Sequence, residues 1–280
     1  MRFGIKGFSA AVVATGVLTT TACSSSGTVA GPSADTSLTG TLSPTKRTTS
    51  ASPPPTTRTT RTVPTTSATS SSSASGSGVP LTTDQIVKVL LTDKDDPGYT
   101  YDPARDDKTV AHTPEVLTAG GRACQTFVDA EEALSTKYGT TAEVDRALTN
   151  TAEAHGIHSS VAVLPTADKG LALISDLTAG LNGCKSLTMS RSDGPVTMVP
   201  TALQTLMRDG EAGFVDYVTI HGNTVLMVFE LVHVGTAVSE VVLVGPVTDD
   251  KTSLEQMGTT LARLSDVQVE RLKAAQGINW

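Results

Sequence analysis

Residues 214–234 read FVDYVTIHGNTVLMVFELVHV, and this stretch decides which kind of sheet the chain can form. Aromatic and β-branched residues fill both halves, and strands favour this composition. Between the halves lie Gly222 and Asn223, a pair typical of a two-residue turn. Two β-rich runs separated by such a turn predict an antiparallel hairpin.

Further runs with strand or helix patterns surround this hairpin. Strands are predicted at 144–152, 157–164 and 239–245, the first two joined by the turn-like EAHG. Helices are predicted at 82–91, 122–134 and 166–184, and a last helix is predicted to begin at a capping box formed by Thr252 and Glu255. Together these elements predict an α+β fold: a mostly antiparallel sheet with helices packed on one face.

Residues 1–22 are typical of an export signal. A short positively charged region precedes FSAAVVATGVL (8–18), which has the length of a signal-peptide core and is too short to span a bilayer. The stretch that ends at Cys23 resembles a bacterial lipoprotein signal, although Thr20 stands where that motif usually has leucine. The resemblance implies cleavage before Cys23 and a diacylglyceryl group on its thiol. The alternative is an ordinary secretory signal with an incidental cysteine.

Residues 23–79 have the composition of a tether. Serine and threonine make up 30 of the 56 residues from 24 to 79, and hydrophobic periodicity is absent from the sequence there. Such a segment cannot bury enough apolar surface to offset the entropy of ordering, so we expect it to be disordered. Its basic residues suit either a solvated spacer or contact with anionic headgroups and wall polymers.

Charge separates this tether from the domain predicted at 80–280. The domain has 15 Lys and Arg against 27 Asp and Glu, a net charge of −12, whereas the tether is basic. The acidic balance argues against nucleic acid as a partner. About 200 residues suffice for one domain with its own core, and we expect a monomer held outside the cell by the lipid anchor.

Two cysteines remain in the domain, Cys124 and Cys184. Disulfides persist in exported proteins, and two cysteines allow only one pairing. Each cysteine lies on or at the end of a predicted amphipathic helix, which favours a structural disulfide between the two helices. The alternative is a catalytic or metal-binding thiol, but neither cysteine is in a CxxC motif and no histidine lies within four residues of either.

The segment VAVLPTADKGLALISDLTAGLNGC (161–184) resembles part of the actinobacterial extracellular sensor domains of PknH-type receptor kinases and of many free lipoproteins. In those domains a strand ends in a similar Leu–Pro–Thr–Ala stretch, and a helix and a cysteine follow. The segment CQTFVDAEEAL (124–134) resembles their earlier helix with the partner cysteine. The resemblance implies an α+β domain with a ligand-binding cleft, no catalytic residues, and a Cys124–Cys184 disulfide. A second, C-terminal disulfide of those domains has no counterpart here.

Motifs of enzymes and cofactor sites are absent from the sequence. It contains no G-x-S-x-G, S-x-x-K, H-E-x-x-H or P-loop pattern, so we expect no catalytic residue, no cofactor and no metal. His155 and His158 lie three apart on a predicted strand and would face opposite ways, which is poor geometry for a shared metal. His112, His221 and His233 are isolated, and each is interpreted as a turn or surface residue.

The acidic stretch DKDDPGYTYDPARDD (93–107) is not an EF-hand, because Pro97 and Ala104 occupy two positions that need ligands. A solvated acidic loop is the default interpretation, and a weak, irregular cation site is the alternative. The candidate ligands of such a site are Asp93, Asp95, Asp96 and Asp102.

The sequence therefore predicts a non-enzymatic cell-envelope lipoprotein that presents a binding or sensor-like domain, with a small molecule or an envelope component as partner. Two alternatives stay open. An enclosed cavity lined by Leu, Val and Ile would favour a carrier of an apolar ligand such as a lipid. A Ser–His–Asp group or a carboxylate pair would favour a hydrolase assembled from dispersed residues.

Overall fold

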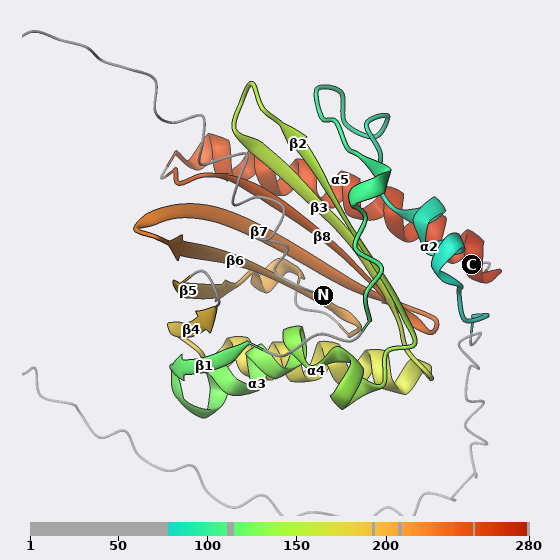
Figure 1. Ribbon diagram of the computed structural model, residues 1–280, viewed down its shortest axis with the longest axis horizontal. Coiled ribbons are helices and arrows are strands. Elements are labelled where there is room, and N and C mark those ends of the chain that lie inside the picture. The colour runs from blue at the N-terminus through green and yellow to red at the C-terminus, as the bar shows by residue number, and fades with distance from the viewer. Residues whose placement is uncertain (1–77, 111–114, 192–193, 207–208, 249, 279–280) are drawn as a thin grey trace, which may run out of the picture. The chain divides into compact units, whose positions relative to one another are not determined.

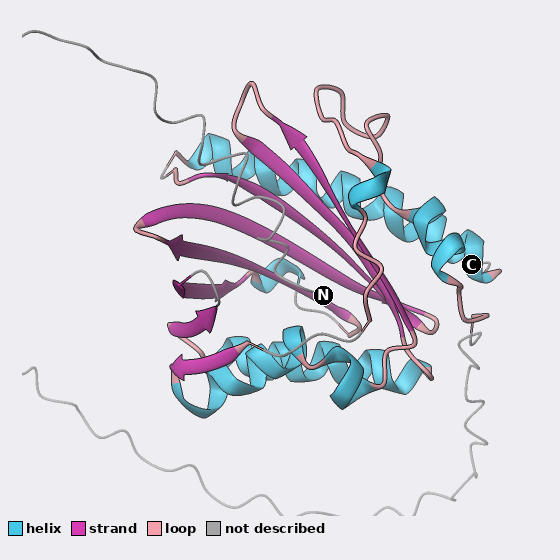
Figure 2. Cartoon of the chain, in the orientation of Figure 1, coloured by secondary structure: helices cyan, strands magenta, loops and turns pink. Residues whose placement is uncertain are grey.

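The computed structural model describes residues 78–110, 115–191, 194–206, 209–248 and 250–278. The predicted signal peptide, Cys23, almost all of the predicted tether and His112 lie outside these residues. The described chain has the predicted α+β fold (Figures 1 and 2). Within it, no helix combines the length and apolar composition needed to cross a membrane.

An eight-stranded antiparallel sheet forms the centre of the fold, in the order β1-β4-β5-β6-β7-β8-β3-β2. Its strands are β1 (Val116–Ala119), β2 (Ala142–Asn150), β3 (His155–Val163), β4 (Leu187–Arg191), β5 (Gly194–Ala202), β6 (Glu211–Ile220), β7 (Asn223–Val234) and β8 (Ala237–Pro246). Strand β3 pairs with β8, its distant neighbour in sequence, so the β2–β3 hairpin joins the sheet beside the β6–β7–β8 meander.

The 214–234 stretch forms the predicted hairpin, but its turn lies one residue earlier than predicted. His221 and Gly222 join β6 to β7, and Ile220 pairs with Asn223. The φ angles of His221 and Gly222 are 50° and 79°, the left-handed values that a type I′ turn needs at both central positions. Asn223 therefore begins β7 instead of lying in the turn.

The described residues form four α-helices where the sequence predicts them: α2 (Thr83–Val89), α3 (Gly121–Glu132), α4 (Ala167–Gly183) and α5 (Lys251–Gln276). Shorter helical turns are η2 (Pro103–Arg105), η3 (Leu134–Tyr138) and η4 (Gln204–Leu206). The predicted cap of α5 is wrong: the helix begins earlier, because the backbone N–H of Ser253 donates to Asp250 at 2.9 Å.

Helices cover both faces of the sheet, which corrects the expected single helical layer. Helix α4, with α3 beside it, packs on strands β5 to β8, whereas α5 packs on the opposite face of β7 and β8, with α2 beside it (Figure 1). The reason is visible in β8, where Val238 and Val242 join the core beneath α4, and Val241 and Leu243 join the core beneath α5. A strand that is apolar on both faces must be covered on both.

On the face toward α4, hereafter the α4 face, aromatic rings hold α3 against the sheet. Phe214 pairs with Phe229 across β6 and β7, and their rings stack with centroids 4.2 Å apart. The ring of Phe127 on α3 meets Phe214 edge-on at 5.4 Å. Gly180 lets α3 and α4 approach closely, because a Cβ there would lie 2.6 Å from the backbone nitrogen of Phe127.

On the opposite face, hereafter the α5 face, a buried glutamine fixes α5 on β3 and β8. The side-chain nitrogen of Gln268 lies 2.9 Å from the carbonyl oxygen of Ser160 and 3.1 Å from that of Glu240, and it also donates to Ser239. Its amide oxygen accepts from Ser159. This network positions the backbone of Ser160 and Glu240, whose side chains point to the α4 face.

Strands β1, β4 and β5 are the part of the sheet that sequence patterns do not predict. Strand β5 contains Pro195 and Pro200, and proline within a run argues against a strand because it cannot donate to the ladder. Pairing with β6 forms the strand nevertheless: Pro200 lies opposite Asp216, whose side chain accepts from the backbone N–H of Val199 at 2.8 Å.

Candidate functional site

Five carboxylates gather on the α4 face, from three elements distant in sequence. We call them the carboxylate cluster: Glu131 and Glu132 at the end of α3, Glu143 and Asp145 on β2, and Glu240 on β8. Their exposed fractions are 1%, 7%, 1%, 6% and 1%. Asp and Glu side chains are seldom buried to this extent, so a group of five is an exceptional feature of this fold.

Strand alternation explains why the three strand residues of the cluster, and two polar neighbours, share one face. Successive side chains of a strand point to opposite faces, so Glu143 and Asp145 lie on the same side of β2. In the sheet register Asp145 is paired with Ser160, and Ser160 with Glu240. His158 stands two residues before Ser160 on β3 and thus faces the same way, at 5% exposure.

Burial raises the pKa of two carboxyl groups of the cluster, Glu131 and Asp145. Burial raises the pKa of Glu131 well above its usual value, and the charges of Glu240, Glu132 and Asp216 raise it further. Burial likewise raises the pKa of Asp145, with contributions from Glu143 and Glu240.

Glu240 is balanced between its two protonation states near neutral pH. Burial and the charge of Glu143 raise its pKa to about 7, against the opposing hydrogen bond from Ser160.

The nearest arginine in sequence faces the wrong way to neutralise the cluster. Arg146 follows Asp145 on β2, so its side chain lies on the α5 face. There it donates to both oxygens of Asp106, at 2.9 and 2.7 Å, and covers the ring of Tyr101. The arginine of β2 thus forms its ion pair on the α5 face, whereas the two carboxylates of the same strand lie on the α4 face.

Several buried polar atoms of the site have no hydrogen-bond partner among the described residues. They are both carboxylate oxygens of Glu131, Oδ1 of Asp145 and Nδ1 of His158. Burial lowers the pKa of His158 to about 4, so at neutral pH its ring is uncharged and offers one donor and one acceptor. Buried polar atoms are nearly always satisfied, so such a concentration of exceptions marks a place where a proton or a ligand is expected.

The described residues do not form a Ser–His–Asp group at this site. The hydroxyl of Ser160 donates to Glu240 at 3.1 Å and not to His158. Asp216 of β6, on the same face, accepts from the backbone of Val199, and burial raises its pKa to about 7. No group of three or more Asp, Glu, His or Cys side chains in the described chain converges as metal ligands would. The described residues of the site thus offer hydrogen-bond donors and acceptors but no serine bonded to a histidine.

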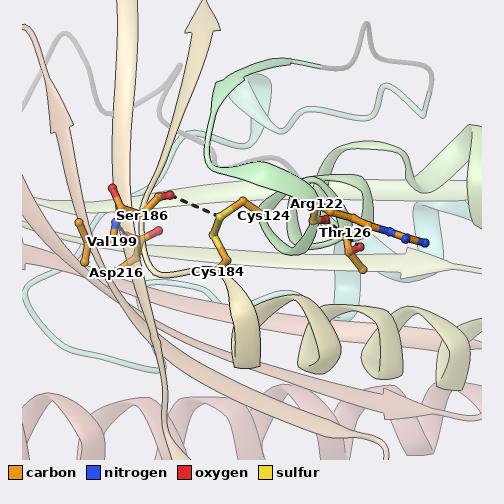
Figure 3. The surroundings of a disulfide bond; sticks show 7 residues. All are labelled: Arg122, Cys124, Thr126, Cys184, Ser186, Val199 and Asp216. Carbon is orange, nitrogen blue, oxygen red and sulfur yellow. Dashed lines mark hydrogen bonds between the residues drawn. A yellow bond between two sulfur atoms is a disulfide. The ribbon is translucent and has the colours of Figure 1, made fainter.

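The predicted disulfide is present and holds α3 beside α4. Cys124 and Cys184 are bonded, with Cα atoms 4.6 Å apart and both residues buried (Figure 3). Sγ of Cys124 also contacts the carbonyl oxygen of Ser186 at 3.4 Å. Because neither sulfur carries a proton, the alternative of a reactive or metal-binding thiol does not apply to this form of the protein.

The acidic loop at 93–107 uses its carboxylates to bind α5 and to cap its own turns. Asp95 forms a two-armed ion pair with Arg271, at 2.6 and 2.9 Å, and Asp96 pairs with Arg263 at 2.9 Å. Asp102 caps η2 by accepting from Ala104. These contacts explain the concentration of acid without a cation.

The remaining histidines are separate from the cluster. His155 and His158 point to opposite faces of β3, as predicted. His221 lies in the hairpin turn, as predicted. His233 is half-buried against Gly170 of α4, where a Cβ would collide with its ring, so it is a packing residue and not a surface one.

A cavity of about 790 Å³ lies at the other end of β3, near the start of α5. Tyr99, Glu153, His155, Ser253 and Met257 are among its lining residues. Burial and the charges of Asp96 and Glu153 raise the pKa of Tyr99 to about 12. Its lining mixes polar and apolar side chains, without the buried unpartnered groups that mark the cluster.

Comparison with known families and structures agrees with this geometry. The model of the PknH-like extracellular domain family matches residues 77–252. The chain belongs to this family. The PknH-like domain therefore spans the sheet, α2 to α4 and the whole carboxylate cluster, and membership in a family of extracellular domains indicates an extracytoplasmic, sensor-like module.

A solved relative shares the fold of this PknH-like domain. The crystal structure of the extracellular domain of PknH from Mycobacterium tuberculosis is 14% identical and has a TM-score of 0.52, over 69% of this chain and 99% of that one. At this identity the likeness shows the fold alone. Comparison with curated proteins finds no match.

Sequence reasoning missed the carboxylate cluster, although one signal was visible. Glu240 lies inside the apolar run SEVVLVG, and Glu143 and Asp145 flank Val144 at strand spacing. Charged residues at alternate positions of a predicted strand indicate a polar face, but the sequence does not show that three such positions and α3 meet.

Proposed function

We propose that this chain is a cell-envelope lipoprotein whose PknH-like domain binds a ligand outside the cell without catalysing a reaction. The observation that carries the proposal is the carboxylate cluster, in which both oxygens of the buried Glu131 lack a partner among the described residues. A site that is buried, polar and unsatisfied, but without a Ser–His–Asp group in the described chain, suits recognition better than catalysis.

The apolar carrier and the hydrolase have weaker support. A lipid carrier needs an enclosed cavity lined by Leu, Val and Ile, whereas the 790 Å³ cavity is lined by Tyr99, Glu153 and His155 among others. A hydrolase of the Ser–His–Asp type needs a serine bonded to histidine, whereas the hydroxyl of Ser160 donates its hydrogen bond to Glu240. The carrier does not explain why carboxylates from α3, β2 and β8 are brought together, whereas neighbouring carboxyl groups are the one feature here that a hydrolase would share.

Anchoring at the outer face of the cell membrane rests on the sequence around Cys23. Two acyl chains on this residue would hold the protein stably, which a single chain does not. The domain would then stand away from the membrane on residues 23–79, as a monomer. Labelling with radioactive palmitate tests this: we expect label on the native chain and none on the Cys23→Ala variant, and equal label on both would contradict the anchor.

Native mass spectrometry of the protein purified from its own host tests the binding site. We expect a co-purifying small molecule that is lost in the Glu240→Gln variant. The matched control is Glu230→Gln, which changes an equally sized buried carboxylate on the α5 face of the neighbouring strand. A ligand retained by Glu240→Gln, or lost equally from both variants, would contradict a site at the cluster.

A further inference from the structure

We propose that the cavity of about 790 Å³ near the start of α5 binds an uncharged sugar, either a free mono- or disaccharide or the terminal sugar of a glycan. The inference goes beyond the proposed function and does not depend on it, because the described residues that line this cavity include no member of the carboxylate cluster. It is carried by the size of the cavity, the chemistry of its lining and the contacts that fix its walls.

The cavity lies where four segments meet at one end of the sheet. They are the loop 96–99, the turn between β2 and β3, the end of β8 and the first turns of α5. Gly245 of β8 keeps the space between two of these segments open, because a Cβ there would lie 3.0 Å from Cδ2 of His155 and 3.6 Å from Cε of Met257. The volume is within the range of about 300–1,000 Å³ that small-molecule sites have, so one or two sugar rings have room here.

The polar part of the lining consists mainly of uncharged groups. Hydroxyl and carboxamide side chains contribute to it from β2, from the segment after β8 and from α5: Asn150, Thr248, Ser253, Gln256 and Thr260. The side-chain oxygen of Asn150 accepts from the backbone N–H groups of Ala152 and Glu153, at 3.2 and 3.3 Å, which leaves its NH₂ group as a donor. A sugar hydroxyl both donates and accepts a hydrogen bond, so it can pair with each of these groups.

Tyr99 provides an aromatic ring and a hydrogen-bond donor in the same cavity. Its ring and the side chain of Met257 line the cavity and pack partly against the core of the α5 face. Burial and the charges of Asp96 and Glu153 raise the pKa of Tyr99 to about 12, so its hydroxyl keeps the proton at neutral pH. A sugar ring has an apolar C–H face that can stack on such a ring, and hydroxyl groups around its edge. This combination matches the mixed lining better than a purely apolar ligand does.

The charges around the cavity argue against an ionic ligand. Its described lining residues include no lysine or arginine, the usual partners of a phosphate or carboxylate. Asp96 is already paired with Arg263 at 2.9 Å. Glu153 lies 3.4 Å from Nδ1 of His155, and because its side chain is 66% exposed, solvent screens its charge. A neutral ligand therefore fits this lining best.

Contacts within the chain fix the walls of the cavity. Asp95, beside the lining loop, makes two contacts with Arg271 of α5, at 2.6 and 2.9 Å. After the loop, Thr100 and Thr149 exchange backbone hydrogen bonds of 3.0 and 2.9 Å, which join this segment to β2. A preformed cavity loses little conformational freedom when a ligand binds, so the few hydrogen bonds of a neutral sugar suffice for binding.

Ligand-observed saturation-transfer NMR of the full chain tests the proposal, in a detergent without a sugar headgroup. The neutral probes are glucose, mannose, N-acetylglucosamine, maltose and chitobiose, and the charged probes are glucuronate and protonated glucosamine. We expect at least one neutral sugar to bind, and glucuronate to bind more weakly because Asp96 and Glu153 repel it. Absent binding of every neutral sugar, or tighter binding of either charged probe, would overturn the proposal.

Paired variants locate the binding site. Gln256→Ala removes an exposed side chain of the lining and should weaken binding of that neutral sugar about three- to tenfold. Tyr99→Leu removes both the ring and the hydroxyl and should weaken it at least about tenfold.

The matched controls lie outside the described lining. Glu255→Ala changes an exposed neighbour on α5, and Tyr101→Leu changes a second tyrosine that packs partly against the core of the α5 face. Both controls should bind the sugar as the native chain does, and circular dichroism would show that each variant is folded. Unchanged binding in Gln256→Ala and Tyr99→Leu, or equal losses in the controls, would overturn the proposed site.

The length of the sugar chain distinguishes the two sources of the ligand. Longer oligomers of the sugar that bind as tightly as its disaccharide would indicate the end of a glycan. Loss of binding with increasing length would indicate a free sugar.

The Glu240→Gln variant separates this inference from the proposed function. It should bind the neutral sugar as the native chain does, because Glu240 is not a lining residue of the cavity. Equal weakening in Glu240→Gln and Gln256→Ala would overturn the cavity as the site. The mass spectrometry described above tests the carboxylate cluster by itself, so either site can fail without the other.

Discussion

Ser160 on β3 donates a 3.1 Å hydrogen bond to Glu240 on β8, although 80 residues separate them in sequence. The two are paired in the sheet, and Gln268 on the opposite face holds both backbones in place. The bond favours the ionised form of Glu240, while burial favours the protonated form. Their balance keeps this carboxyl group titrating near neutral pH.

Removing the hydroxyl of Ser160 should raise the pKa of Glu240. Hydrogen bonds to charged groups contribute about 1.5–3 kcal/mol, so Ser160→Ala should raise this pKa by about one unit or more. Carboxyl carbon NMR of the titrating protein measures the change. Ser159→Ala is the matched control, because that hydroxyl bonds Gln268 on the other face. An unchanged Glu240 titration in Ser160→Ala would refute this assignment.

Stability should fall as pH rises through the range in which the buried carboxyl groups ionise. Glu240 and Asp216 have folded-state pKa values of about 7, above the 4.5 and 3.8 of the unfolded chain. The stability that each contributes is fully present below its unfolded pKa and is lost as pH rises through the folded pKa. Each group accounts for up to about 3–4 kcal/mol between pH 4 and 7.

His158 acts in the opposite direction, because its pKa of about 4 lies below the unfolded value of 6.5. Its contribution is present above pH 6.5 and is lost as pH falls toward 4. Urea denaturation from pH 4 to 8 measures the sum. Glu240→Gln should flatten the loss above pH 5, and Glu230→Gln should not. Identical pH profiles for the native chain and Glu240→Gln would contradict the role of Glu240.

The disulfide should supply a large part of the stability of the domain. Closing a loop of 60 residues contributes about 4 kcal/mol in the chain-entropy model. We expect no free thiol from Cys124 or Cys184 in the unreduced, unfolded protein. Cys124→Ala should cost as much as the double replacement with Cys184→Ala. Two alkylated thiols without reduction would contradict the bond, and mass spectrometry after alkylation counts them.

The ion pair between Arg146 and Asp106 should be costly to break. Both side chains are at most 3% exposed and their closest atoms are 2.7 Å apart. Asp106→Asn leaves a buried guanidinium without its counter-charge, so we expect a loss of about 3–5 kcal/mol in the free energy of unfolding. Glu255→Gln, which removes an exposed pair with Lys251, should cost less than about 1 kcal/mol. Similar losses in both variants would contradict this difference.

Local chemistry explains which parts of this protein could be predicted. Some elements depend mainly on residues that are neighbours in sequence, and the structure contains all of those that were predicted on that basis. They are the β-rich runs around Gly222, the helix that starts after Thr82, and the helices that carry Cys124 and Cys184. Strand β5 could not be predicted in this way, because its prolines argue against a strand and only pairing with β6 forms it.

The sequence by itself determined the class of the fold, the β2–β3 and β6–β7 hairpins and the pairing of the two domain cysteines, because these follow from residue periodicity, turn chemistry and the number of cysteines. Only the tertiary structure decided that helices cover both faces and that Glu131, Asp145 and Glu240 share one side of the sheet. Alternation along a strand tells which residues share a face of that strand, but not which strand becomes its neighbour. The long-range pairing of β3 with β8 supplies that information, and with it the candidate site.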